Sequence, residues 1–124
     1  MKILHIGPIN SLRPTGITNA ILNLSTALVV HGHRVAILPS VPVRVTKDMI
    51  PPGIVLISGP QKYHWNPWVI SNKWLDVIKD SFGKPDIINI HGLYIPFQTA
   101  IARLFSRERW PYIVSPHGSF AQNA

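Results

Sequence analysis

The chain has 124 residues, of which 46% are hydrophobic and 14% are charged, as is typical of one soluble globular domain with its own core. Twelve Lys and Arg against five Asp and Glu give a formal charge of +7, which favours an anionic partner such as a nucleotide, a sugar phosphate or an acidic membrane surface. The basic residues are scattered and cysteine is absent, so the sequence disfavours a nucleic-acid-binding protein and excludes disulfides and thiolate metal sites.

Short apolar runs alternate with helical patterns along the chain. Five runs predict strands, because each is continuous and most stop at Gly or Pro; they lie near residues 2–6, 34–38, 54–57, 86–90 and 112–115. The first helical pattern, which Thr15 can cap and Gly32 can end, has apolar positions at Ile17, Ala20, Ile21, Leu24, Ala27 and Leu28. The second has Asn66 as a plausible N-cap and Pro67 at the first helical position, and the third covers 96–105.

The predicted strands are continuous apolar runs with no alternation of polar and apolar residues, which favours a parallel sheet with helices on both faces. We therefore predict an α/β fold with the strand order 3-2-1-4-5. In such a sheet the strand-to-helix connections share one edge, and ligands bind at the carboxyl ends of the strands, near the point where the strand order reverses. Residues 7–16, 91–92 and 117–118 follow the first, fourth and fifth predicted strands, so we expect them to meet at this edge.

The residues expected at this edge have both a ligand-binding and a structural interpretation. Gly16 would let an anion approach the free N–H groups of the first helical turn, but glycine is also tolerated at a helix start. A single histidine at a strand end more often bonds the backbone, whereas His91 and His117 form two equivalent His-Gly pairs, which favours a ligand role. His5 is interpreted as a core histidine, and the aromatic residues of 63–68 as a carbohydrate or membrane contact or as a cap over the sheet.

Several motifs of nucleotide-dependent and hydrolytic enzymes are absent. The loop after the first strand reads GPINSLRPTG and lacks the G-x-G-x-x-G fingerprint, and neither a G-x-x-x-x-G-K-[ST] loop nor a G-x-S-x-G elbow occurs. Asp76 and Asp80, beside Lys73 and Lys79, have the pattern of a solvated helix face. We therefore expect no metal ion and no other cofactor, and the sequence disfavours a serine nucleophile.

An ordered series of segments carries a family resemblance. MKILHIGP, PTGITNAILNLSTAL, HGHRVAIL, PDIINIHGLY and PYIVSPHGSF resemble, in this order, the N-terminal half of family 4 glycosyltransferases. These are retaining enzymes with the GT-B architecture, in which two Rossmann-like domains face each other across a cleft. The family usually has a pair of glycines in the first loop, and here Thr15-Gly16 stands in its place.

The resemblance implies roles for individual residues. Gly16 and the N–H groups of Ile17 and Thr18 would lie against the diphosphate of the donor or against the acceptor. His117 matches the histidine at the reaction centre, where it would hydrogen-bond the transferred sugar; Gly118 beside it leaves room for a ligand, and His91 would shape the acceptor side. The leaving phosphate is thought to take the acceptor proton in such enzymes, so a neutral imidazole that orients the sugar fits better than a base.

The resemblance also implies how the chain belongs to a larger enzyme. Residues 1–124 would form a partial N-terminal, acceptor-side domain with a Rossmann-like sheet, without the C-terminal nucleotide-sugar domain, and this fragment alone would be inactive. The enzyme would transfer a hexose from a nucleotide sugar to a glycan or lipid-linked acceptor in bacterial surface polysaccharide biosynthesis. We expect it in the cytoplasm, as a peripheral protein on the anionic inner face of the membrane. The alternatives are a non-catalytic α/β binding module that acts with a separate chain and, more weakly, a nucleotide-binding oxidoreductase domain.

Overall fold

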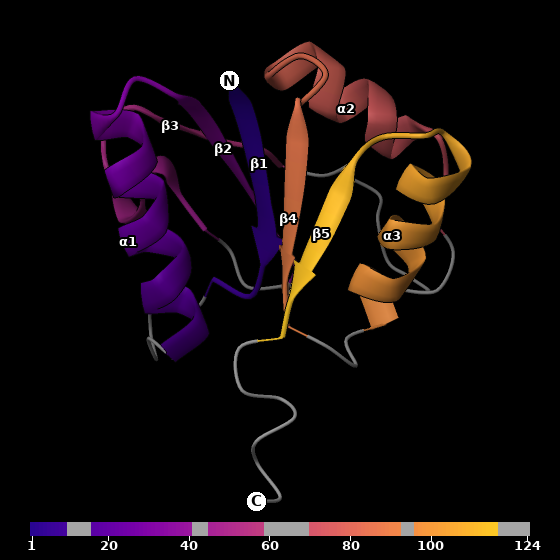
Figure 1. Cartoon of the computed structure of the whole chain (residues 1–124), viewed down its shortest axis with the longest axis horizontal. Helices are drawn as coiled ribbons and strands as arrows, with labels where there is room; N and C mark the ends of the chain where they lie inside the picture. The colour runs from indigo at the N-terminus through magenta and orange to yellow at the C-terminus, as the bar shows by residue number, and fades with distance from the viewer. Residues whose placement is uncertain (10–15, 41–44, 59–69, 93–95, 117–124) are drawn as a thin grey trace, which may run out of the picture.

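The computed structural model describes residues 1–9, 16–40, 45–58, 70–92 and 96–116, and Figure 1 shows its α/β architecture. Its elements are β1 (Lys2–Gly7), α1 (Gly16–Val30), β2 (Arg34–Pro39), the short 3-10 helix η1 (Lys47–Met49), β3 (Ile54–Leu56), α2 (Lys73–Ser81), β4 (Ile87–His91), α3 (Pro96–Arg107) and β5 (Tyr112–Ser115). All five predicted strands are present, and their ends differ from the predicted ones by one residue at most.

The five strands form one parallel sheet in the order β3-β2-β1-β4-β5, which confirms the predicted order. The central strand is β1, whose Ile3 pairs with Val35 of β2 on one side and with Ile87 of β4 on the other. With α1 on one face and α2 and α3 on the other, the arrangement is Rossmann-like (Figure 1). All carboxyl ends lie at the lower edge in Figure 1, and the strand order reverses between β1 and β4.

Alternate residues of the strands belong to two separate apolar cores. The face towards α2 and α3 has the larger core, formed by Leu4, Ile6, Ala36, Leu38, Ile88 and Ile90 of the sheet with Trp74, Ile78, Phe97, Ile101 and Phe105 of the helices. The face towards α1 has a smaller core, which includes Ile21, Val35, Ile37 and Ile54. The inner strands are largely apolar because they bury both faces, which is the pattern that predicted a parallel sheet.

Helix α1 buries a stripe that only partly matches the predicted one. Ile21 is fully buried as expected, whereas Leu24 is 41% exposed and the polar Thr18 is buried. This helix has apolar side chains around most of its circumference, so spacing alone could not select the buried face. Its end agrees with the prediction, since Gly32 follows the last turn with a φ of +89°.

The prediction that the second helix begins at 66–67 is wrong. Those residues lie outside the described part of the chain, but the residues just before Asn72 are not helical, and α2 begins at Lys73 with Asn72 as its N-cap. Polar side chains hold this start: Ser71 Oγ accepts the backbone N–H of Lys73 at 3.3 Å, and Asn72 Oδ1 accepts Arg107 Nη2 of α3 at 2.8 Å. Such side-chain bonds compete with a helix that would continue upstream.

Strand β5 lies at one edge of the sheet. Its central residues Ile113 and Val114 point to opposite faces, because successive strand side chains alternate, and they are 52% and 42% exposed. Both faces of this strand are therefore only partly covered, in contrast to β1, where Ile3, Leu4 and Ile6 are all buried.

Candidate functional site

The carboxyl ends of the strands meet at one edge, as a parallel sheet requires, and we call it the carboxyl-end edge. Backbone hydrogen bonds join the residues there: the Ser40 N–H donates to the Gly7 carbonyl at 2.9 Å, and the Gly92 N–H donates to the Ser115 carbonyl at 2.7 Å. These bonds extend the sheet to the last residues of the strands. The backbone that leads into each connection is therefore held in place.

A pair of buried histidines lies just inside this edge. His5 Nδ1 of β1 is 2.8 Å from His91 Nε2 at the end of β4, and each residue is 1% exposed. Since Asn89 is the register partner of His5, His91 lies one side-chain repeat further along the same face. Burial lowers the pKa of His5 from 6.5 to about 4, so its ring is neutral near pH 7. In this bond one ring donates a proton and the other accepts it.

Gln98 connects the first turn of α3 to the ends of two strands. Its Nε2 donates to the His91 carbonyl at 2.7 Å and to Ser40 Oγ at 3.3 Å, and the residue is 3% exposed. The donation to a carbonyl settles the orientation of the amide, because the reverse orientation would place two oxygens together. Gln98 Oε1 and His5 Nε2 are buried atoms for which the described residues supply no hydrogen-bond partner.

Gly7 ends β1 where the chain has no room for a side chain. A Cβ at this position would lie 2.6 Å from Ile21 Cδ1 of α1 and 3.1 Å from His91 Cβ. Both distances are shorter than ordinary contacts between carbon atoms. The glycine thus allows α1 and the end of β4 to pack closely against the end of β1.

The start of α1 is open at its first residue and anchored two residues later. Gly16 is exposed, and no atom lies within 4 Å of the place where its Cβ would be. Ile17 is half-buried, and Thr18 is buried with its Oγ1 donating to the Pro8 carbonyl at 3.0 Å. The first turn contains no acidic residue, so the positive end of the helix dipole is not neutralised there by a carboxylate.

Some of the predicted site residues lie outside the described part of the chain. His117 and Gly118 are among them, as are the aromatic residues of 63–68 and the predicted cap Thr15. By sequence, His117 is separated from the end of β5 only by Pro116. The structure thus brings His91 and the start of α1 to the same edge of the sheet and does not test the role of His117.

The described ranges contain neither a group of metal-binding side chains nor a helix that could span a membrane. No three or more His, Cys, Asp or Glu side chains gather there in a way that could hold a metal ion. No helix in these ranges has the length and apolar character needed to cross a bilayer.

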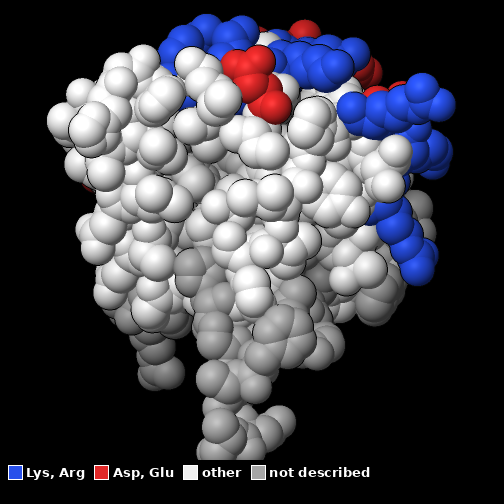
Figure 2. Space-filling model, in the orientation of Figure 1, with Lys and Arg blue, Asp and Glu red and all other residues white. Residues whose placement is uncertain are grey.

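Basic side chains gather away from the carboxyl-end edge in the visible part of the molecule. Figure 2 shows Lys and Arg over the opposite edge, at the amino ends of the strands, and along the flank of α3. Two of them cover aromatic rings: Arg34 lies 5.4 Å from the ring centre of Phe82, and Lys84 lies 5.9 Å from that of Trp110. The net charge therefore does not by itself locate an anion site at the carboxyl-end edge.

Sequence reasoning missed the hydrogen bonds behind this edge. His5 was correctly interpreted as a core histidine, but its bond to His91 depends on the register of β1 against β4. The available signal was His5 inside the first apolar run and His91 directly after the fourth. Gln98 gave no signal beyond its place at the start of a helix that follows a His-Gly pair.

A parallel sheet of this order, with polar residues and an open helix start at its carboxyl-end edge, defines a Rossmann-like domain. The family model described as Glycosyltransferase Family 4 matches residues 14–124, and the chain belongs to this family. Membership supports a glycosyltransferase-type function, and the sheet is consistent with the N-terminal domain of a GT-B enzyme. A search of curated proteins found no match.

Proposed function

We propose that this chain forms a partial N-terminal, acceptor-side domain of a glycosyltransferase that transfers a hexose from a nucleotide sugar to a glycan or lipid-linked acceptor. The observation that carries the proposal is the family match over residues 14–124, together with the exposed Gly16 at the carboxyl-end edge. A second Rossmann-like domain, which this chain does not contain, would supply most contacts to the nucleotide sugar. The pathway that we propose is the biosynthesis of a bacterial surface polysaccharide.

The distribution of charge along the sequence supports an anionic ligand. Arg13, Arg44 and Lys62 occur in the segments 10–15, 41–44 and 59–69, which belong to the connections after β1, β2 and β3, and none of these segments contains Asp or Glu. In a parallel sheet those connections start at the carboxyl-end edge. A nucleoside diphosphate is an anion that basic side chains and the free N–H groups of a helix start can both bind.

The proposed chemistry is retaining and independent of metal. His117 would donate or accept a hydrogen bond to the transferred sugar as a neutral ring, and the leaving phosphate would take the proton of the acceptor hydroxyl. His91 would act from inside the fold, since its ring is buried against His5 and its carbonyl is bonded to Gln98. It would shape the acceptor side through the backbone at Gly92.

A charge placed at the start of α1 tests the proposal. The full-length protein that contains this chain would be incubated with a panel of nucleotide sugars and a membrane extract as the source of acceptor, and release of nucleoside diphosphate would be measured. Gly16→Asp should fold, because the position is open, and should lose most of the activity, because its carboxylate would repel the diphosphate.

A matched control places the same charge further along α1. Asn23→Asp introduces a carboxylate at an exposed position beyond the first turn, and its activity should stay close to that of the unmodified protein. The proposal would be contradicted if no nucleotide sugar in the panel gave release of nucleoside diphosphate, or if Gly16→Asp kept full activity.

A further inference from the structure

Two buried polar atoms on the α1 side of the sheet have no hydrogen-bond partner among the described residues. They are His5 Nε2 of β1 and Ser25 Oγ of α1, and the two residues are 1% and 0% exposed. A buried donor or acceptor without a partner is unfavourable and uncommon in folded proteins. Two such atoms on neighbouring elements can be satisfied by one shared partner.

The hydroxyl of Ser25 does not bond to its own helix. A serine or threonine inside a helix can donate to the carbonyl four residues before it, as Thr26 Oγ1 does at 2.9 Å. Of the three residues that α1 buries, Thr18 donates to a carbonyl outside the helix at 3.0 Å, Ile21 is apolar, and Ser25 has an unbonded hydroxyl. Packing alone would be served by alanine, so the hydroxyl of Ser25 indicates a polar partner.

Ser25 and His5 lie at the same height between helix and sheet. α1 connects two parallel strands and runs opposite to β1 (Figure 1), and a Cβ at Gly7 would lie 2.6 Å from Ile21 Cδ1. His5 is two residues before Gly7 on the same face of β1, which is about 6.6 Å back along the strand. Ser25 is four residues after Ile21 on the same face of α1, which is about 6 Å in that same direction. The two polar residues are therefore neighbours in the layer between α1 and β1.

The surroundings of the two atoms are otherwise apolar. The smaller core on this face of the sheet consists of Ile9, Ile21, Val35, Ile37, Ile50 and Ile54. These residues offer no side-chain hydrogen bond, and Ile37 is the register partner of His5 on β2. A buried water molecule needs polar partners and enough space. Ser25 supplies one of the partners and is also smaller than Ile21 one turn before it, which leaves room beside the helix.

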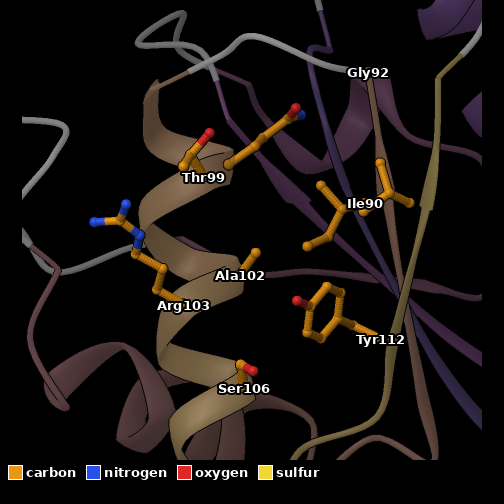
Figure 3. Close-up of a pocket in the computed structure, with 9 residues that line it drawn as sticks. Ile90, Gly92, Thr99, Ala102, Arg103, Ser106 and Tyr112 are labelled. Atoms are coloured by element: carbon orange, nitrogen blue, oxygen red, sulfur yellow. The ribbon is translucent and has the colours of Figure 1, made fainter.

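His5 is one end of a line of hydrogen bonds that crosses the sheet. Its Nδ1 is bonded to His91 Nε2 at 2.8 Å, and the His91 carbonyl accepts Gln98 Nε2, which also donates to Ser40 Oγ. Gln98 and Gly92 are among the residues around a pocket of about 330 Å³ between α3 and the β4–β5 half of the sheet (Figure 3). A partner at His5 Nε2 would join α1 to this line, and so to the backbone of the carboxyl-end edge on the other face.

We propose that a buried water molecule bridges Ser25 Oγ and His5 Nε2, and that Ser25 is thereby a positioning residue for the His5–His91 pair. Water can donate or accept at either atom, so the bridge fits both tautomers of the His5 ring. With both of its nitrogens bonded, the ring cannot turn without breaking two hydrogen bonds. The bridge goes beyond the proposed transfer reaction and does not depend on it, so this chain alone is sufficient for the test.

A crystal structure of the unmodified chain is the direct test. At a resolution that shows ordered water, one water molecule should lie within about 2.7–3.2 Å of both Ser25 Oγ and His5 Nε2. A direct bond between the two side chains, a water that touches only one of them, or no water between them would overturn the bridge.

Ser25→Ala tests the bridge through the sign of its effect on stability. If the hydroxyl is bridged, its removal leaves the water one partner short, and the equilibrium constant for unfolding should rise about threefold to tenfold. If the hydroxyl has no partner, alanine removes an unsatisfied group and favours the helix, so the constant should fall. Urea denaturation near neutral pH measures the constant, and an unchanged or lower value contradicts the proposal. The crystal structure decides the outcome if this variant does not fold.

The positioning role is read from the rings themselves. Long-range ¹H–¹⁵N NMR spectra resolve the ring nitrogens of His5, and Ser25→Ala should shift the Nε2 resonance of His5 and the backbone amide of Gly92. Thr26→Ala is the matched control, because it removes a neighbouring, exposed hydroxyl that bonds within the helix, and it should leave both signals in place. The positioning role is wrong if Ser25→Ala moves neither signal, or if Thr26→Ala moves both by as much.

Discussion

His5 Nδ1 lies 2.8 Å from His91 Nε2, and this bond joins the central strand β1 to the end of β4 inside the fold. Both rings are buried, and the described residues offer no partner to the remaining nitrogen of His5. A charge on His5 would therefore be poorly solvated. Neutral rings therefore suit this buried bond better than a charged His5 does.

The first prediction is that the free energy of unfolding falls when the pH is lowered through the range in which a free His5 side chain would be protonated. Its pKa is about 4 in the folded chain and 6.5 in the unfolded chain, so protons bind preferentially to the unfolded state between these values. The free energy of unfolding should be highest above pH 6.5 and should fall by about 3 kcal/mol as the pH approaches 4.

Urea unfolding at several pH values measures this dependence. His5→Asn should be less stable near neutral pH but should have a flatter profile between pH 6.5 and 4, because the titrating group is gone. His31→Asn, a change at an exposed residue, should keep the slope of the unmodified chain. The same slope in His5→Asn as in the unmodified chain would show that other groups cause it.

The second prediction concerns the close packing at Gly7. Gly7→Ala should lower the free energy of unfolding by about 1–3 kcal/mol, because the new Cβ would lie 2.6 Å from Ile21 Cδ1 and 3.1 Å from His91 Cβ. Ile21→Val removes Cδ1, so the double variant should lose less stability than the sum of the two single variants. Chemical denaturation measures all three.

Gly16→Ala is the control for this prediction, because it adds the same methyl group in open space. Its stability should be unchanged or slightly higher, since alanine favours the helix. Equal destabilisation by Gly7→Ala and Gly16→Ala would mean that the tight packing at Gly7 does not matter.

The third prediction concerns His117, whose place in the sequence directly follows the Pro residue after β5. In the full-length enzyme His117→Ala should lower kcat/KM by roughly 10²-fold or more, as expected when an oriented polar contact at the reacting centre is lost. His33→Ala, at the far end of α1, should change activity little. Steady-state kinetics with thermal melts test both; near-normal turnover of His117→Ala, or a loss explained by unfolding, would leave this histidine a structural role.

The fourth prediction is that the intact protein binds anionic lipid. The charge of +7 on these 124 residues and the aromatic residues of 63–68 motivate this prediction, and each basic residue near such a surface contributes about 1 kcal/mol. Sedimentation with anionic vesicles should carry the protein into the pellet, and sedimentation with neutral vesicles should not. Equal binding to both, or to neither, would rule out an electrostatic membrane contact.

The sequence predicted the sheet well because its strands are local features. Each strand is a short apolar run that ends at a recognisable residue, and the parallel direction of the strands follows from the burial of both faces of the sheet. The start of α2 was predicted wrongly because Asn66-Pro67 resembles a helix start more than Asn72 does, while Asn72 is held by Arg107, a residue of another helix. Contacts of this kind cannot be recognised from local spacing.

The candidate site was predictable in position and not in its internal bonds. The carboxyl-end edge follows from the order of strands, so the placement of His91 beside β1 could be expected. The bond between His5 and His91 requires the register of two strands that are far apart in sequence, and the bond from Gln98 requires the rotation of α3 about its axis. Neither quantity can be derived from apolar periodicity.

The central place of β1 has a consequence for how the protein is made. As the ribosome releases the chain from its amino end, β1 can pair with β2 soon after Arg34 emerges, but its other side stays unpaired until Ile87 and the rest of β4 have been synthesised. Such pairing between distant segments forms slowly, and an open strand is prone to aggregation in the meantime. We expect nascent chains that end before β4 to depend on chaperones more than chains that extend beyond it.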